Sequence, residues 1–173
     1  MEFSREAVHE VELLADYLTQ HSLYLATAES VTAGRIAAAL GVLEGSGQIM
    51  ERGYVVYSPD AKIKLLGVAP ETINAFTLTS EEVALEMARG ALVDSAANVS
   101  VATTGIAGGA PMDGKEPGTV CFAWAYILNG ETHAFARTVQ FIGDREAIIH
   151  QASKYALSQI NDFHQRAMAG EGI

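Results

Sequence analysis

Several features on which protein classes depend are scarce in this sequence. The 173 residues include a single cysteine, Cys121, which excludes an intramolecular disulfide framework and a zinc site built from several cysteines. Eleven lysine and arginine residues stand against 21 aspartate and glutamate residues, giving a net charge of −10. This balance argues against a protein that binds nucleic acid by neutralising its phosphates.

Long apolar runs are also absent. The most apolar stretch, Cys121–Leu128, has eight residues, whereas a membrane span needs about twenty. The first twelve residues carry Glu2, Glu6, Glu10 and Glu12, which are not typical of a secretory signal or a transit peptide. We therefore expect a cytoplasmic protein with neither a membrane nor a nucleic-acid partner.

The length predicts one domain. Hydrophobic residues make up 49% of the chain and charged residues 18%, which is typical of a globular protein. A folded monomer of 18.4 kDa should expose roughly 8,000 Å². We expect a single domain over residues 1–173, with its core at about 5–165 and a frayed tail at 166–173.

Apolar periodicity and capping residues predict alternating helices and strands. Asn129-Gly130 predicts a hairpin turn between the last two strands, and Thr79 to Glu82 matches a capping box. This order predicts an α/β fold with a mixed, mostly parallel sheet and helices on both faces. The predicted strands are 23–28, 54–57, 98–104, 119–128 and 132–141, and the predicted helices begin near Ser4, Thr32, Ser58, Thr79 and Asp144.

The loops that follow the first three predicted strands carry polar or flexible residues. In such sheets, ligands bind at the carboxyl ends of the strands. Ser30 follows the first strand and is a candidate nucleophile beside a helix N-terminus, where backbone N–H groups stabilise an oxyanion. The alternative is that Ser30 or Thr32 only caps the helix. No histidine lies in these three loops, so Lys62 is the remaining base, provided that burial lowers its pKa. The alternative is an exposed helix lysine.

Other candidates surround this pair. Tyr57 is placed to orient Lys62 or relay a proton, or else it is a packing residue. Arg145 begins the last helix and is a candidate anion ligand, or else it pairs with Asp144 or Glu146. The loop 105–118 is rich in glycine but matches neither a P-loop nor a dinucleotide fingerprint. No HExxH or CxxC motif supports a metal site.

Taken together, these segments resemble the CinA C-terminal domain family over residues 5–163. The resemblance implies a three-layer α/β/α domain that forms homo-oligomers, most simply dimers, and that stands alone here. It rests on ordered segments that read Thr27-Ala28-Glu29-Ser30, Tyr57-Ser58, Ala61-Lys62, Leu65-Leu66-Gly67-Val68, Ser80-Glu81-Glu82-Val83-Ala84, Thr104-Gly105-Ile106-Ala107-Gly108, Gly118-Thr119-Val120 and Gly143-Asp144-Arg145.

The resemblance also implies an activity. The family's characterised reaction is hydrolysis of the carboxamide of nicotinamide mononucleotide to nicotinic acid mononucleotide and ammonia, without a cofactor. It assigns the nucleophile to Ser30, the general base to Lys62, and supporting roles to Tyr57 and Thr104. The predicted substrate-binding residues are Thr32, Gly34, Gly105, Ile106, Ala107, Gly108 and Arg145.

The sequence departs from the family pattern around this site. Val31 and Ala33 replace a cysteine and a glycine of the usual AESCTGG, and residues 77–80 read TLTS in place of GAVS. The loop 108–118 is reshaped and gains Glu116, whose charge would oppose a substrate phosphate. Two alternatives follow: a paralogue that binds a ligand with lost or altered activity, and an amidohydrolase with another substrate.

Overall fold

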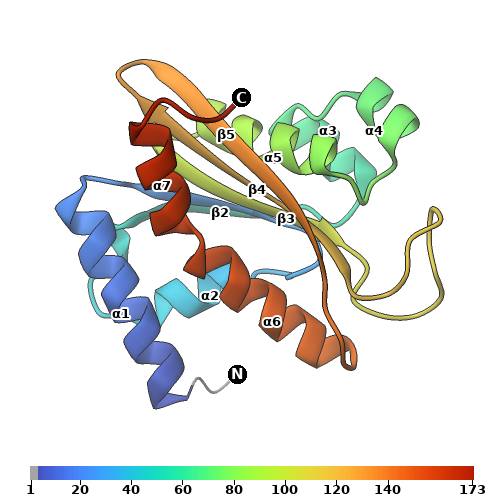
Figure 1. Cartoon of the computed structure of the whole chain (residues 1–173), viewed down its shortest axis with the longest axis horizontal. Coiled ribbons are helices and arrows are strands. Elements are labelled where there is room, and N and C mark those ends of the chain that lie inside the picture. The colour runs from blue at the N-terminus through green and yellow to red at the C-terminus, as the bar shows by residue number, and fades with distance from the viewer. Residues whose placement is uncertain (1–3) are drawn as a thin grey trace.

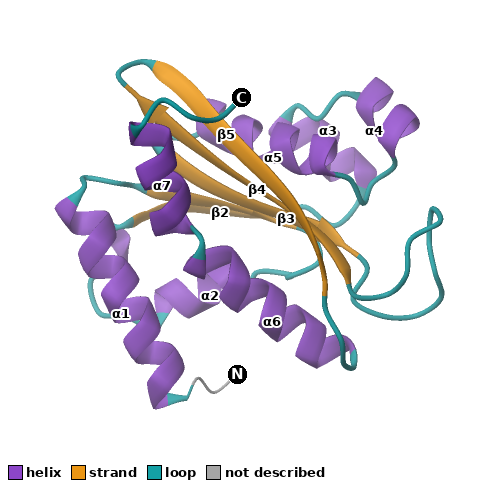
Figure 2. Ribbon diagram, in the orientation of Figure 1, coloured by secondary structure: helices purple, strands orange, loops and turns teal. Residues whose placement is uncertain are grey.

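The computed structural model describes residues 4–173, which form three layers (Figures 1 and 2). A five-stranded sheet in the order β2-β1-β3-β4-β5 lies between two layers of helices. A short 3₁₀ helix spans Ser46–Gln48. The other elements are α1 (Arg5–Gln20), β1 (Leu25–Glu29), α2 (Arg35–Gly41), β2 (Met50–Val55), α3 (Pro59–Leu66), α4 (Pro70–Phe76), α5 (Glu81–Val93), β3 (Val99–Gly105), β4 (Thr119–Leu128), β5 (Glu131–Gln140), α6 (Arg145–Ser158) and α7 (Ile160–Met168).

The sheet is mixed, as predicted. β1 pairs in parallel with β2 and β3, whereas β4 pairs antiparallel with β3 and β5. The β4–β5 turn has positive φ at both Asn129 (53°) and Gly130 (84°), as a tight hairpin requires. Within residues 4–173, no helix is both long and apolar enough to cross a membrane.

The two faces of the sheet carry side chains of different size. Along β4, Phe122, Trp124 and Tyr126 face the layer of α1, α2, α6 and α7, while Ala123 and Ala125 face α5. Alternate residues of a strand point to opposite faces, so one strand builds both cores. The face of small residues allows α5 to approach the sheet closely.

Helix α3 in turn packs on α5 through a glycine. A Cβ atom at Gly90 of α5 would collide with the carbonyl group of Leu66, the last residue of α3. The position of α3, which carries Lys62, is therefore set by α5 and through it by the sheet.

Two helix boundaries differ from the sequence prediction. Ser80, not Thr79, caps α5, because its Oγ accepts the N–H of Val83 at 3.3 Å. The helix predicted from Asp144 through Ile160 is divided at Gln159 into α6 and α7. At the break, Trp124 Nε1 donates to the carbonyl of Ala156 and Tyr126 Oη to that of Ile160, at 2.8 and 2.7 Å.

The prediction of a frayed tail at 166–173 is wrong. Helix α7 continues to Met168 and buries Ala167. The N–H and carbonyl groups of Ile173 then exchange 3.0 Å hydrogen bonds with those of Ala134 on β5. The tail is thus held at the edge of the sheet by backbone hydrogen bonds, which the composition of the tail does not predict.

Candidate active site

The candidate residues converge at the carboxyl ends of β1, β2 and β3, the edge from which the loop 106–118 extends (Figure 2). Ser30 directly follows β1, and its N–H donates to the carbonyl of Thr103 at 2.9 Å. The register pairs Glu29 with Thr103, so Ser30 and Thr104 come next on the same face of adjacent strands. Lys62 reaches this face from α3.

Ser30 and Lys62 form a buried pair. Lys62 Nζ lies 2.9 Å from Ser30 Oγ, and the two residues are only 1% and 9% exposed, respectively. Lys62 Nζ also donates to the carbonyl oxygens of Val56 at 2.8 Å and Tyr57 at 3.1 Å. The exposed-lysine alternative is therefore wrong.

Burial favours the neutral form of this lysine. Desolvation lowers the pKa of Lys62 from 10.5 to about 8, because the charged form loses its hydration. A neutral amine has two N–H donors and one lone pair. The two carbonyl oxygens take both donors, which directs the lone pair at the Ser30 hydroxyl. This is the geometry of a base that takes the serine proton.

Local capping places Lys62. Ser58 Oγ accepts the N–H of Ala61 at 3.1 Å, Pro59 occupies the first helical position and Gly67 ends the helix with φ of 66°. These are the start and stop signals that the sequence predicted. They fix the position of α3, so that Lys62, its fourth residue, contacts the backbone that directly follows β2.

Glu29 organises the turn that follows the nucleophile, and the sequence reasoning missed it. Its fully buried carboxylate accepts the N–H groups of Gly34, Ile36 and Ala37 at 2.9–3.0 Å and the Thr32 hydroxyl at 2.7 Å. The signal available in the sequence was a glutamate at the end of an apolar strand, a few residues before a helix. Because Glu29 occupies these donors, the N-terminus of α2 is not the predicted oxyanion site.

Other N–H groups remain beside Ser30. Within residues 4–173, those of Val31 and Thr32 have no acceptor. An N–H that immediately follows a nucleophile is a common oxyanion donor. Thr32 and Gly34 themselves hold the turn: Thr32 Oγ1 lies 2.7 Å from Thr103 Oγ1, and Gly34 has φ of 90°.

Tyr57 and Arg145 contact each other, which neither sequence alternative predicted, and the alternative that pairs Arg145 with Asp144 or Glu146 is wrong. The Tyr57 backbone carbonyl holds Lys62, while its half-exposed hydroxyl accepts a 2.7 Å hydrogen bond from Arg145 Nη2. Asp144 caps α6 instead of pairing with Arg145. In residues 4–173, Arg145 has no ion-pair partner. Its guanidinium is therefore free to bind an anion.

Two surface depressions meet at Arg145. One, of about 500 Å³, is lined by Ala107, Gly108 and Gly143, and the other, of about 350 Å³, by Thr32 and Ala33. Glu116 lines neither depression. Ser30 and Lys62 line neither depression; the second reaches the turn that follows Ser30 through Thr32. The depressions therefore give room for an anionic group beside Arg145, next to the turn that carries the nucleophile.

Two predicted binding residues, Gly105 and Ile106, and the predicted supporting residue Thr104 have structural roles. A Cβ atom at Gly105 would lie 2.5 Å from the carbonyl oxygen of Thr119, so this glycine lets β3 approach β4. Ile106 is buried and its N–H donates to the same carbonyl at 2.9 Å. Thr104 Oγ1 donates to the carbonyl of Leu78 at 2.8 Å, which ties the loop before α5 to the site.

Two departures from the family pattern carry backbone strain. Ala33 has φ of 53°, a left-handed conformation that favours glycine. Thr77 has φ of 70° and ψ of 169°, a region that is almost exclusive to glycine. Both stand where the family pattern has glycine, so the loops keep a glycine-like path with larger residues.

Comparison with known proteins places the chain in one family. The CinA C-terminal domain model matches residues 8–164. Nicotinamide-nucleotide amidohydrolase PncC and Protein YdeJ, both of Escherichia coli strain K12, are each 36% identical to it; the alignments cover 86% and 85% of this chain and 89% and 84% of those proteins.

Longer relatives and solved structures also match this chain. A CinA-like protein of Chloroherpeton thalassium is 39% identical over 87% of this chain, which spans 36% of that protein's length. The crystal structure of a competence or damage-inducible protein from Enterobacter asburiae superposes with a TM-score of 0.82 at 38% identity, over 88% of this chain and 94% of that one. The chain belongs to the CinA C-terminal domain family.

Proposed function

We propose that this protein hydrolyses the carboxamide of nicotinamide mononucleotide, giving nicotinic acid mononucleotide and ammonia. The observation that carries the proposal is the buried Ser30–Lys62 contact of 2.9 Å. The relative named a nicotinamide-nucleotide amidohydrolase supports the choice of substrate.

The proposed reaction has two halves. Neutral Lys62 takes the Ser30 proton as Ser30 Oγ attacks the carboxamide carbon, and the oxyanion accepts the N–H groups of Val31 and Thr32. The Lys62 ammonium then gives its proton to the carboxamide nitrogen, the C–N bond breaks, and ammonia departs, which leaves an acyl ester on Ser30. In the second half, Lys62 takes a proton from water as the water oxygen attacks the ester; the bond to Ser30 Oγ then breaks, Lys62 returns the proton to that oxygen, and the carboxylic acid is released.

The charge of Arg145 and the two depressions beside it support a nucleotide as the substrate. The chain carries −10 overall, so an anionic substrate needs a local cation. Arg145 is that cation: it is held by Tyr57 at 2.7 Å and lines both depressions. We place the substrate phosphate at its guanidinium and the carboxamide at Ser30.

The family resemblance also favours a homodimer.

The test is ammonia release from nicotinamide mononucleotide, with chromatography of the product. We expect turnover by the wild type and none by Ser30→Ala. Ser100→Ala is the matched control, because Ser100 is also buried but its hydroxyl donates to the carbonyl of Ala88. Turnover in Ser30→Ala would contradict the assignment of the nucleophile.

One observation favours a second candidate, an amidohydrolase with a different substrate or a binding protein with weakened activity. The dyad is intact, yet Ala33 adds a side chain to the depression beside Arg145, where the family pattern has glycine. Absence of ammonia from the folded wild type would support this candidate. A panel of related carboxamides then separates altered specificity from lost chemistry.

A further inference from the structure

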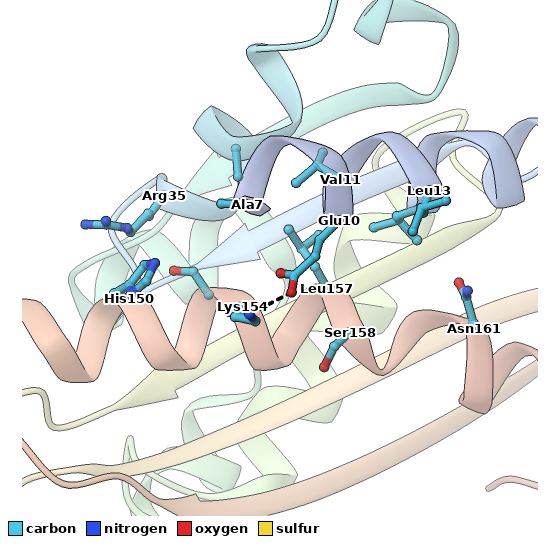
Figure 3. Close-up of a pocket in the computed structure, with 13 residues that line it drawn as sticks. Ala7, Glu10, Val11, Leu13, Arg35, His150, Lys154, Leu157, Ser158 and Asn161 are labelled. Carbon is cyan, nitrogen blue, oxygen red and sulfur yellow. Dashed lines mark hydrogen bonds and ion pairs between the residues drawn. The ribbon is translucent and has the colours of Figure 1, made fainter. Parts of the chain in front are cut away.

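A groove separate from the candidate active site lies between α1, α2 and α6, within the layer that covers the opposite face of the sheet from Lys62 (Figure 3). Its volume is about 300 Å³, at the small end of the range for ligand sites. Val11 and Leu14 of α1, Ala39 of α2 and Leu157 of α6 supply its apolar lining.

A single ion pair crosses the groove. Glu10 of α1 and Lys154 of α6 meet at 2.7 Å, with side chains about half exposed (Figure 3). Exposed pairs of this kind contribute about 0–1 kcal/mol, so opening this bridge costs little. The ion pair therefore does not prevent a ligand from entering the apolar part of the groove.

Two residues of the lining carry a buried polar atom without a partner. Four side-chain polar atoms in residues 4–173 are buried and make no hydrogen bond, and two of them, Arg35 Nε and Asn161 Oδ1, belong to residues that line this groove. The two residues lie at opposite ends of it, with His150 beside Arg35 (Figure 3). Buried polar groups are nearly always hydrogen-bonded in folded proteins, and these two atoms are covered by protein, so a ligand reaches them only when the side chains turn. The group open to a ligand is the Arg35 side chain, which is partly exposed and lines the groove.

The residues that line the groove carry one net positive charge, and Glu6 of α1 also acts on the charge of Lys154. Glu10 and Lys154 neutralise each other, and among residues 4–173 Arg35 has no acidic partner. We propose that this groove is a second ligand site, for a small amphipathic anion with an aromatic or short acyl body. Its carboxylate, sulfonate or phosphate binds Arg35, and its apolar body fills the space between α1 and α6.

The site also adjoins the candidate active site. Arg35 is the first residue of α2 and lines the depression that contains Thr32, Ala33 and Arg145. An anion in the groove thus contacts a residue within the segment 32–37 that the Glu29 carboxylate binds.

The probe for this proposal is 8-anilinonaphthalene-1-sulfonate, which combines an apolar body with one anionic group. We expect saturable fluorescence enhancement with one dye per chain. Arg35→Gln weakens binding about tenfold or more, because it removes a charge-assisted contact. Arg5→Gln is the matched control, since Arg5 lies on α1 but outside the groove.

A second pair of variants tests the volume. Ala7→Phe places a ring in the groove and abolishes binding, whereas Ala38→Phe, at an exposed alanine outside it, does not. Should Ala7→Phe fail to fold by circular dichroism, Ser158→Trp fills the same groove from α6.

Three outcomes would overturn the proposal. They are no saturable binding, equal loss in the control variants, and loss in Arg145→Gln with retention in Arg35→Gln, which would place the dye in the depressions at the active site. None of these measurements depends on turnover, so a protein without amidohydrolase activity still tests the groove.

Discussion

The pH dependence of turnover follows from the environment of Lys62. Its pKa is lowered from 10.5 to about 8 by burial, a cost to the charged form of about 3 kcal/mol. At pH 7 the neutral fraction is then about one tenth, roughly 300-fold more than for an unburied lysine. The base is active only when neutral, so activity is lost as the pH falls through about 8. We expect kcat/KM to rise about tenfold from pH 6 to 7, a further fivefold to pH 8, and to level off above pH 9.

The assay is ammonia release across pH 6–10, with the fold checked by circular dichroism at each value. Lys62→Arg should be inactive throughout, because a guanidinium stays protonated. A direct measurement is available even without turnover: the Lys62 Cε resonance, assigned by comparison with Lys62→Arg, should titrate near pH 8. A flat rate profile, an active Lys62→Arg protein or a resonance that titrates above pH 10 would refute the reasoning.

Three further predictions concern stability, measured by urea unfolding. Thr77→Gly should gain about 1–2 kcal/mol, because relief of the strained backbone exceeds the entropy cost of glycine and the loss of a 3.3 Å contact from Lys115 Nζ; no gain would mean that the backbone is relaxed. Glu29→Gln should lose about 2–3 kcal/mol, since an amide nitrogen cannot accept the N–H bonds that the carboxylate holds, and near-wild-type stability would contradict its role in the turn. Burial, and then the charge of His21, lower the pKa of His164 below 6.5, so the neutral form stabilises the fold and stability should decrease as the pH falls from about 7 to 5. His164→Gln should reduce that dependence, and an unchanged slope would assign it to other groups.

Local signals made much of the fold predictable. The Ser58 cap, Pro59 and Gly67 bound α3 by contacts within a few residues, and Asn129-Gly130 specifies its own turn. Such signals can be recognised in the sequence because they depend only on neighbouring residues. The long strands β4 and β5 were predicted for the same reason.

Features that depend on distant residues were missed. Helix α4 begins where Glu86 of α5 accepts the N–H of Ala69 and the hydroxyl of Thr72, at 2.8 and 2.6 Å. Pro70 in its first turn is a local start signal that was overlooked, but the capping carboxylate itself lies 17 positions from Ala69. The tail pairs with Ala134, which lies 39 positions before Ile173. At the site, residue types identified Ser30 and Lys62 as candidates, but only the packing of α3 under β2 reveals that Lys62 is buried.

The alanines of the sheet have a consequence for how the site tolerates change. α5 rests on Ala123 and Ala125, and α3 rests on α5 where Gly90 meets Leu66. A Cβ atom at Gly90 would meet the carbonyl group of Leu66 and must displace α3. Because α3 carries Lys62, such a change in α5 would alter the distance between Ser30 and Lys62 without touching either residue in the sequence.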